Sequence, residues 1–178
     1  VLVLAGDDHA PKSSTLSVQS EHSLVGVKIP VLYPAGVQDF LDFGLYGWAM
    51  SRYTGLWIGF KVVSDTVESA ASVMIDPHRA QVTLPTDFAM PPDGLNIRWP
   101  DLWYVQDDRI ELHKLDAARA FVRANKLDRV VIDGPKARLG IVSVGKSYLD
   151  VRQALDDLGI CLEDLEDRAL ERERPAGA

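Results

Sequence analysis

The sequence predicts an α/β fold in which parallel strands alternate with helices. Three short apolar runs, at residues 1–5, 29–34 and 56–63, have the character of buried strands, and helical patterns at 20–28 and 37–53 separate them. Strands and helices that alternate in this order form parallel sheets with helices on their faces. The chain is 47% hydrophobic and 25% charged over 178 residues, which is sufficient apolar material for such a core.

The first strand, at residues 1–5, is entirely apolar and leads directly into the polar loop Gly6-Asp7-Asp8-His9. An apolar strand of this kind is typical of a parallel sheet that is covered on both faces. Domains seldom begin at such a strand, because chain termini usually lie at the surface. We therefore expect the chain to start inside a larger domain; a trimmed start of a small complete domain is the alternative.

The helix after the second strand is predicted from the spacing of its apolar residues. Val37, Leu41, Leu45 and Trp48 recur at the interval of one face of an amphipathic helix. Gly55 follows as a stop signal, and the third strand begins immediately after it. We expect this apolar stripe to face the sheet.

The remainder of the chain predicts a connector and a second α/β unit. Short β segments are expected at residues 72–75 and 80–84, and one long helix at 107–124. Two strand candidates follow at 129–133 and 139–144, and a final helix at 147–158. We divide the chain into a first domain over 1–84, a connector and linking helix over 85–126, the start of a second α/β domain over 127–160, and an acidic tail over 161–178 that is expected to be frayed or disordered.

Composition excludes several classes of function. A formal net charge of −7 argues against a nucleic-acid partner, which would require a basic surface. The apolar runs are far shorter than the roughly 20 residues that span a bilayer, and no signal segment opens the chain, so we expect a cytoplasmic protein without a membrane partner. The single cysteine, Cys161, excludes an internal disulfide and any cysteine-ligated cluster built from this chain alone.

The densest polar cluster follows the first strand, where the carboxyl ends of parallel strands face the ligand crevice. Its members are Asp7, Asp8, His9, Lys12, Ser13, Ser14 and Thr15. The aspartates can bind a divalent cation or cap turns, and the histidine can titrate near neutrality or be structural. The hydroxyl residues can bind an anion or cap the next helix. Spacing alone favours structural roles for the aspartates and the histidine.

A second motif, Gly140-Ile-Val-Ser-Val-Gly145-Lys146-Ser147, has the spacing of a phosphate-binding P-loop. Residues 141–144 have the character of a strand, whose amides would be engaged in ladder hydrogen bonds and unable to cradle a phosphate. A nucleotide-binding α/β protein is therefore the weaker alternative. Serine-hydrolase chemistry has no support, because no Gly-x-Ser-x-Gly turn is present and the histidines are scattered.

Ordered motifs along the chain resemble the indolepyruvate ferredoxin oxidoreductases in their long fused bacterial form. Those that resemble the pyrimidine-binding domain of this family are Gly6-Asp7-Asp8-His9, Lys12-Ser13-Ser14-Thr15, Gln19-Ser20-Glu21-His22, Ile29-Pro30-Val31-Leu32 and Val37-Gln38. Further similar stretches are Tyr46-Gly47-Trp48-Ala49-Met50-Ser51-Arg52, Asp65-Thr66-Val67-Glu68-Ser69, Gly94-Leu95-Asn96-Ile97-Arg98-Trp99-Pro100, and the run from Gly145 to Leu155. The likeness covers about residues 1–160.

This resemblance implies that the first domain is part of a pyrimidine-type thiamine diphosphate domain. It implies oxidative decarboxylation of an aryl 2-oxoacid such as indolepyruvate to the acyl-CoA, with thiamine diphosphate, Mg²⁺ and iron–sulfur clusters as cofactors and with coenzyme A and ferredoxin as partners. It also places the activating glutamate before Val1 and the diphosphate-binding domain and cluster cysteines outside this chain. We therefore expect the chain alone to be inactive, to bind none of these cofactors tightly, and to need the remainder of the enzyme or an oligomer. A non-catalytic remnant that depends on a partner is the alternative.

Within the polar loop, the resemblance places Ser14 where a hydroxyl residue helps to hold the carboxylate of the 2-oxoacid. Ser13, Asp7, Asp8 and His9 follow as substrate-binding candidates. The resemblance assigns no catalytic residue, no cofactor-binding residue and no metal ligand within this chain. Ala10-Pro11 departs from the small, glycine-containing turn that is expected of the family at this point.

Overall fold

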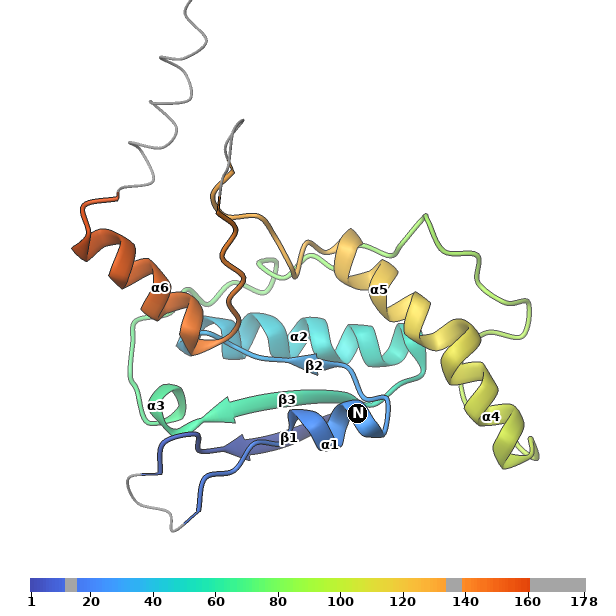
Figure 1. The fold of residues 1–178 in the computed structure, drawn as a ribbon. Coiled ribbons are helices and arrows are strands. Elements are labelled where there is room, and N and C mark those ends of the chain that lie inside the picture. The colour runs from blue at the N-terminus through green and yellow to red at the C-terminus, as the bar shows by residue number, and fades with distance from the viewer. Residues whose placement is uncertain (12–15, 134–138, 161–178) are drawn as a thin grey trace, which may run out of the picture. The chain divides into compact units, whose positions relative to one another are not determined.

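The computed structural model of the protein describes residues 1–11, 16–133 and 139–160 (Figure 1). It divides into two compact units, Val1–Asp128 and Arg129–Ala178. The stretch at 85–126, which the sequence predicts to be a connector, falls within the first unit. The predicted acidic tail at 161–178 lies outside the described residues.

The first unit is built on a three-stranded parallel sheet. Its strands are β1 (Leu2–Asp7), β2 (Val31–Leu32) and β3 (Ile58–Val63), in the order β1-β3-β2. All pairings are parallel, so the predicted alternation of parallel strands with helices is confirmed. The register pairs Asp7, the last residue of β1, with Val63, the last residue of β3. These two strands therefore end together at one edge of the sheet.

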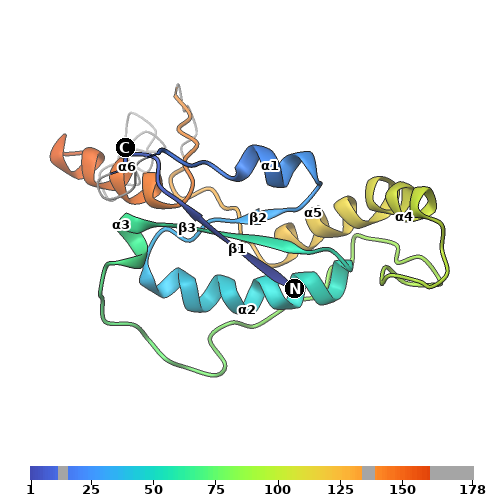
Figure 2. The same cartoon turned by 90° about the horizontal axis from the view of Figure 1, so that it is seen from below.

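Helices cover both faces of the sheet. Figure 2 shows α1 (Glu21–Gly26) on one side and α2 (Val37–Thr54) on the other. Successive side chains of a strand point to opposite faces, and β3 follows this rule. Phe60 packs against Phe40 of α2, with ring centroids 6.1 Å apart, whereas a Cβ at Gly59 would meet Leu24 of α1. Two residues on from Gly59, Lys61 shares the face of the sheet that α1 covers.

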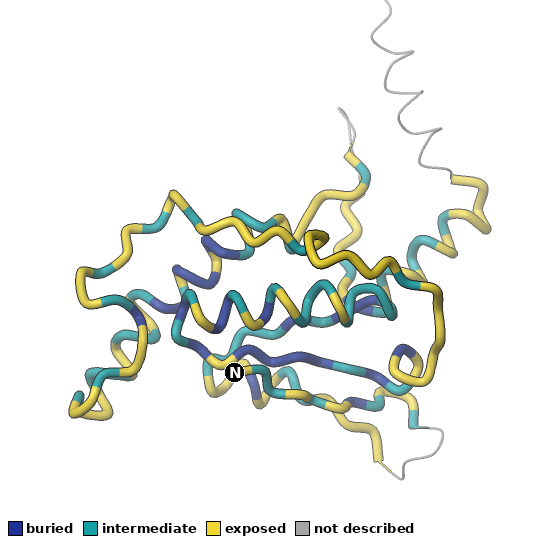
Figure 3. The backbone as a smooth tube through the Cα atoms, turned by 180° about the vertical axis from the view of Figure 1, so that it is seen from behind, coloured by how far each residue is buried: buried dark blue, intermediate teal, exposed yellow. Residues whose placement is uncertain are grey.

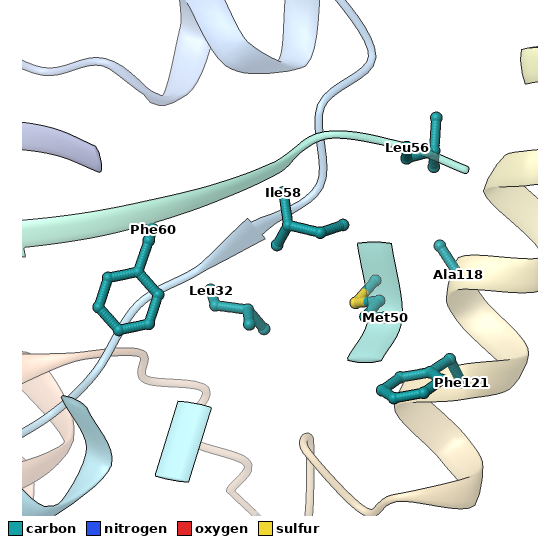
Figure 4. Packing of buried hydrophobic residues seen from close by; sticks show 7 residues of the cluster. All are labelled: Leu32, Met50, Leu56, Ile58, Phe60, Ala118 and Phe121. Atoms are coloured by element: carbon teal, nitrogen blue, oxygen red, sulfur yellow. The ribbon is translucent and has the colours of Figure 1, made fainter. Parts of the chain in front are cut away.

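The hydrophobic core lies between the sheet, α2 and a later helix, α5 (Leu115–Ala124). It consists of Leu32, Met50, Leu56, Ile58, Phe60, Ala118 and Phe121 (Figure 4). The central strand β3 is buried along almost its whole length (Figure 3). Burial of several such side chains supplies about 1.5–3 kcal/mol each, which makes β3 the best-anchored strand of the sheet.

The predicted helix after the second strand is present, but the apolar stripe that was expected to face the sheet is largely exposed. Leu41, Leu45 and Trp48 are about half exposed, while Gly47 and Met50 lie on the buried side. The reason is close packing: a Cβ at Gly47 would approach the ends of the Leu2 and Leu32 side chains to 2.7 and 3.1 Å, so glycine lets the helix lie this close to the sheet without those side chains shifting. Four aromatic residues of α2 also pack, partly buried, against the core, and periodicity alone did not single them out: Phe40, Phe43, Tyr46 and Tyr53.

One helical stretch follows a long irregular segment. It comprises α4 (Trp103–Arg109), a π-helical turn η1 (Ile110–Lys114) and α5 (Leu115–Ala124). The helix predicted at 107–124 is confirmed, and it begins four positions earlier in the structure, at Trp103. α5 buries Ala118 and Phe121.

The β segments predicted at 72–75 and 80–84 are wrong. After α3 (Ser64–Val67), no strand occurs between residues 68 and 102, all of which the structure describes. The backbone amide of Met74 is bound by the side chain of Gln38 at 2.8 Å, and that of Thr83 by Asn125 at 2.8 Å. These amides bond to side chains of α2 and of the residue that follows α5, and not to a neighbouring strand, so the strand-like pattern does not produce a strand here.

In the second unit, α6 (Lys146–Asp157) confirms the final predicted helix. The strand candidates at 129–133 and 139–144 are wrong, because neither forms a strand. Val142 is fully exposed and Val130 is 76% exposed, and within the described residues of this unit no sheet buries these apolar runs. In the described parts of both units, no helix combines the length and apolar character that crossing a membrane requires.

Candidate functional site

A cluster of three charged side chains and one histidine lies near the edge of the sheet where β1 and β3 end. Asp7 closes β1, and His9 lies two residues farther along the chain. Lys61 comes from β3, where it pairs in register with Ala5 of β1. Glu21 is the first residue of α1. We call these four residues the Lys61 cluster.

Lys61 is the centre of this cluster. Its side chain is 1% exposed, and its Nζ lies 2.9 Å from His9 Nε2, 3.2 Å from Asp7 Oδ2 and in an ion pair with Glu21 Oε1. The ring of Tyr33 packs against the same ammonium, with 4.6 Å between Nζ and the ring centroid. An ammonium group has three N–H donors and no acceptor. Three acceptors therefore satisfy all its donors.

Asp7 is buried, and it joins β1 to the start of α1. The backbone N–H of Ser20 donates to Asp7 Oδ2 at 2.9 Å, and the Ser20 hydroxyl donates to Oδ1 at 2.5 Å. Burial by itself would raise the pKa of Asp7, but the two hydrogen bonds from Ser20 and the charge of Lys61 outweigh it and lower that pKa. Asp7 is consequently an ionised, structurally committed carboxylate.

Glu21 has one committed and one free carboxylate oxygen. Burial acts to raise the pKa of Glu21, but the hydrogen bond from Lys61 and the backbone N–H of Glu21 itself lower it overall. The Oε2 atom is buried, and within the described part of the chain it has no hydrogen-bond partner. A buried acceptor without a donor is costly, so this oxygen is a point at which the cluster can accept a further donor.

The same residues have donor atoms that could hold a metal ion. One ligand atom each from Asp7, His9 and Glu21 lies within 4.8 Å of the others. The Lys61 ammonium, however, is within hydrogen-bonding distance of all three, and it occupies the position that a cation would take. The residues present therefore do not fit a divalent cation while Lys61 is in place.

A pocket opens beside His9. It has a volume of about 400 Å³ and is lined by His9, Ser17, Val18 and Gln19. Two backbone hydrogen bonds between Asp8 and Val18, of 3.2 and 2.9 Å, close the neck of the loop that carries the pocket. His9 is thus shared: it lines the pocket, and its Nε2 contacts the buried ammonium.

The structure brings together two of the five predicted substrate-binding residues, Asp7 and His9, in the Lys61 cluster. Asp8 lies at the neck of the loop and pairs with Val18 through its backbone. Ser13 and Ser14 lie outside the described residues. A role in substrate binding stays a prediction for all five residues.

Sequence reasoning missed Lys61 and Glu21. One signal for Lys61 was present: it is the single charged residue in the apolar run at 56–63. Lysine is almost never fully buried unless it is paired, so a lysine in a buried strand predicts acidic partners. Glu21 follows Ser20 at a predicted helix start, where an acidic residue is ordinarily read as a favourable charge at the helix N-terminus.

The P-loop-like motif does not contain the strand that was predicted at residues 141–144. Residues 141–144 are not a strand, so their amides are not held in a ladder, and that reason for excluding a phosphate cradle was wrong. Lys146, the lysine of the motif, instead forms an ion pair of 2.6 Å with Asp150 one turn along α6. Glycine at position 145 adopts a positive φ of 59° as the helix begins.

Comparison with known proteins gives one match. Residues 129–172 match the family model of the indolepyruvate oxidoreductase domain. The match lies in the second unit and includes the P-loop-like motif and α6. No curated protein and no solved structure is significantly similar to the chain. The match supports the indolepyruvate oxidoreductase family. It contains one of the stretches that carry the resemblance, the run from Gly145 to Leu155, and the others, at residues 6–100, lie outside it.

Proposed function

We propose that this chain is a segment of a thiamine-diphosphate-dependent indolepyruvate-type 2-oxoacid:ferredoxin oxidoreductase. The match of residues 129–172 to an indolepyruvate oxidoreductase domain carries the proposal. The ordered motifs from Gly6-Asp7-Asp8-His9 onward, which resemble the same family, support it from the other end of the chain. The reaction is the oxidative decarboxylation of an aryl 2-oxoacid to its acyl-CoA, with electrons passed to ferredoxin.

We assign the 2-oxoacid to the pocket beside His9. Ligands of open parallel sheets bind outside the carboxyl ends of the strands, and this pocket follows β1 at that edge. A 2-oxoacid presents a carboxylate and a ketone oxygen, which both accept hydrogen bonds. His9 borders the pocket, and the resemblance adds the hydroxyl of Ser14. These side chains would orient the substrate by donating to its oxygens.

The cofactors are assigned to other parts of the enzyme. A diphosphate needs an electropositive cradle, whereas the two carboxylates of the Lys61 cluster outnumber its single ammonium. A magnesium ion would compete with Lys61 for the same three ligand atoms. The cluster fits neither group. Thiamine diphosphate, Mg²⁺, the iron–sulfur clusters, coenzyme A and ferredoxin therefore act in the complete enzyme, at residues outside this cluster.

The activity test uses both the chain and the complete enzyme. The chain alone, supplied with indolepyruvate, thiamine diphosphate, Mg²⁺, coenzyme A and ferredoxin, should give no turnover. The complete enzyme that contains it should oxidise indolepyruvate and form the acyl-CoA. Turnover by the purified chain would overturn the segment assignment. A complete enzyme that does not oxidise aryl 2-oxoacids would overturn the proposed reaction and favour a non-catalytic remnant.

The substrate pocket is tested with Ser14→Ala in the complete enzyme. Loss of a hydrogen bond to a carboxylate costs about 1.5–3 kcal/mol, so kcat/KM should fall roughly tenfold to a hundredfold while Tm stays nearly constant. Ser72→Ala, at an exposed position of the irregular segment, is the matched control and should change neither quantity. If Ser14 only caps a helix, the substitution would instead cost about 1 kcal/mol of stability and leave kcat/KM unchanged.

A further inference from the structure

The contact between Lys61 and His9 determines where the proton of the His9 ring lies. Neutral imidazole has one nitrogen that donates and one that accepts, and the two tautomers differ in which is which. Lys61 Nζ can only donate, and it lies 2.9 Å from His9 Nε2. That nitrogen must therefore accept, and the ring proton must lie on Nδ1.

The Lys61 ammonium is held firmly enough to impose this choice. Lys61 belongs to the central, buried strand β3, and its side chain is 1% exposed. Asp7 and Glu21 take up two of its N–H donors, and Tyr33 covers the group. The third N–H has His9 Nε2 as its acceptor. A buried ammonium that lost this acceptor would keep an unsatisfied donor, so His9 is bound in one orientation.

We propose that Lys61 is a positioning residue: it fixes His9 as the Nδ1–H tautomer and so makes His9 a neutral hydrogen-bond donor for the ligand of the adjacent pocket. His9 lines this pocket, and Nδ1 is the only ring nitrogen not committed to Lys61. A ligand group at Nδ1–H must accept a hydrogen bond, which selects a carbonyl or carboxylate oxygen and excludes an ammonium group. The assignment of that oxygen to a 2-oxoacid rests on the proposed function; the tautomer does not.

Nuclear magnetic resonance of the ¹⁵N-labelled full chain tests the tautomer directly. The chain has four histidines, and loss of one set of ring signals in His9→Gln identifies those of His9. In the wild type, His9 Nε2 should be pyridine-like and Nδ1 pyrrole-like. In Lys61→Met the pattern should move toward the Nε2–H form that free imidazole side chains prefer in water. Lys61→Arg, which keeps the donors, should retain the wild-type pattern.

Lys114→Met is the matched control, because Lys114 is another buried lysine of the first unit and is not among the partners of His9. It should leave the His9 signals unchanged. A wild-type His9 protonated on Nε2 would overturn the proposal, and this measurement decides even if Lys61→Met fails to fold. An unchanged His9 tautomer in folded Lys61→Met would also overturn it, because Lys61 would then not set the proton position.

Binding of phenylpyruvate, an aryl 2-oxoacid, tests the ligand class. Addition to the wild-type chain should shift the His9 Nδ1–H signal, and Lys61→Met should weaken binding about tenfold or more, the range that loss of one charge-assisted hydrogen bond gives. Phenethylamine, which has an ammonium in place of the acceptor oxygens, should not bind at His9. If the tautomer is as stated but phenylpyruvate leaves the His9 signals unmoved, the positioning role stands and the assignment of the 2-oxoacid to this pocket fails.

Discussion

Replacement of Lys61 by methionine is predicted to be one of the most destabilising substitutions in the first unit. Methionine has a similar length and no charge, so the substitution removes the ammonium without leaving a large void. Removing one partner of a buried ion pair costs about 3–5 kcal/mol, because the other charge stays buried without compensation. Here the charge left without its partner is the carboxylate of Asp7, whose side chain is fully buried.

Two features place the expected loss near the lower end of this range. Asp7 keeps both of its hydrogen bonds from Ser20. Glu21 is 29% exposed and can turn toward water once its partner is gone. We therefore expect Lys61→Met to lower the free energy of unfolding by about 3 kcal/mol at neutral pH. In urea this is a fall of roughly 1–3 M in the unfolding midpoint, for slopes of about 1–3 kcal/mol/M.

The loss should depend on pH in a direction that the structure determines. The pKa of Asp7 in the folded protein lies below its ordinary value of 3.8, so Asp7 stabilises the fold above that pH and ceases to do so as pH falls through the lower folded value. Without Lys61, burial still raises the pKa of Asp7 and the two hydrogen bonds from Ser20 still lower it, but the ammonium no longer adds to the lowering, so the pKa of Asp7 should lie higher than in the wild type. The deficit of Lys61→Met should be complete near neutrality and shrink below about pH 4.

The control is Lys114→Met, the same substitution at another buried lysine. Burial and the nearby Arg109 lower the pKa of Lys114, and among the described residues no carboxylate pairs with it; Nζ donates only to the carbonyl of Gly55 at 3.3 Å. Its replacement should change stability by less than about 1 kcal/mol, since an unpaired buried charge is removed along with one long hydrogen bond. Equal losses in the two variants, or a Lys61→Met deficit that does not shrink as pH falls below about 4, would refute the assignment of the effect to Asp7.

Three further substitutions test how the irregular segment at 68–102 is held. Gly55→Ala should cost about 2–4 kcal/mol in urea unfolding, because Gly55 has a φ of 67° and a Cβ there would collide with the carbonyl oxygen of Leu95; Gly94→Ala, at a φ of 70° with open space around it, should cost only about 1 kcal/mol. Asn125→Ala should accelerate hydrogen exchange of the Thr83 amide, which the Asn125 side chain binds at 2.8 Å, whereas unchanged exchange would show that the segment is held by other contacts.

The sheet and its helices could be predicted because each signal is local. A largely apolar run of five to eight residues with Gly or Pro at one end marks a buried strand, and residues 56–63, which follow Gly55 and contain β3, show this pattern. The order of strands and helices then fixes parallel pairing. From that topology it follows that residues after β1 lie at the edge where ligands bind, which is how Asp7 and His9 entered the candidate site.

The failures share one physical cause, which is that local pattern does not report what a segment packs against. Residues 72–75 and 139–144 have strand-like composition, but strands exist only where an edge is open to them. The buried side of α2 was misplaced because Gly47 carries no apolar side chain for a periodicity argument to count, although its lack of a side chain is what admits the sheet. In both cases the deciding information lies in a distant segment.

Lys61 lies in a strand that was predicted correctly, but its partners lie in distant segments. For this reason sequence reasoning missed the centre of the cluster. Its neighbours in β3 made the strand easy to recognise, and a strand predicted to be buried gives no reason to expect a charge inside it. The partners that make burial tolerable come from the end of β1 and the start of α1, 54 and 40 positions away. These positions share no periodicity, and what relates them is the opposite charge of their side chains.

A buried lysine requires acceptors for its three N–H donors. At the carboxyl ends of the parallel strands, the groups that accept from Lys61 also lie beside the pocket that His9 lines. The same contacts therefore keep Lys61 buried and hold His9 beside the pocket, so a substitution that disturbs the burial of Lys61 should also disturb the pocket.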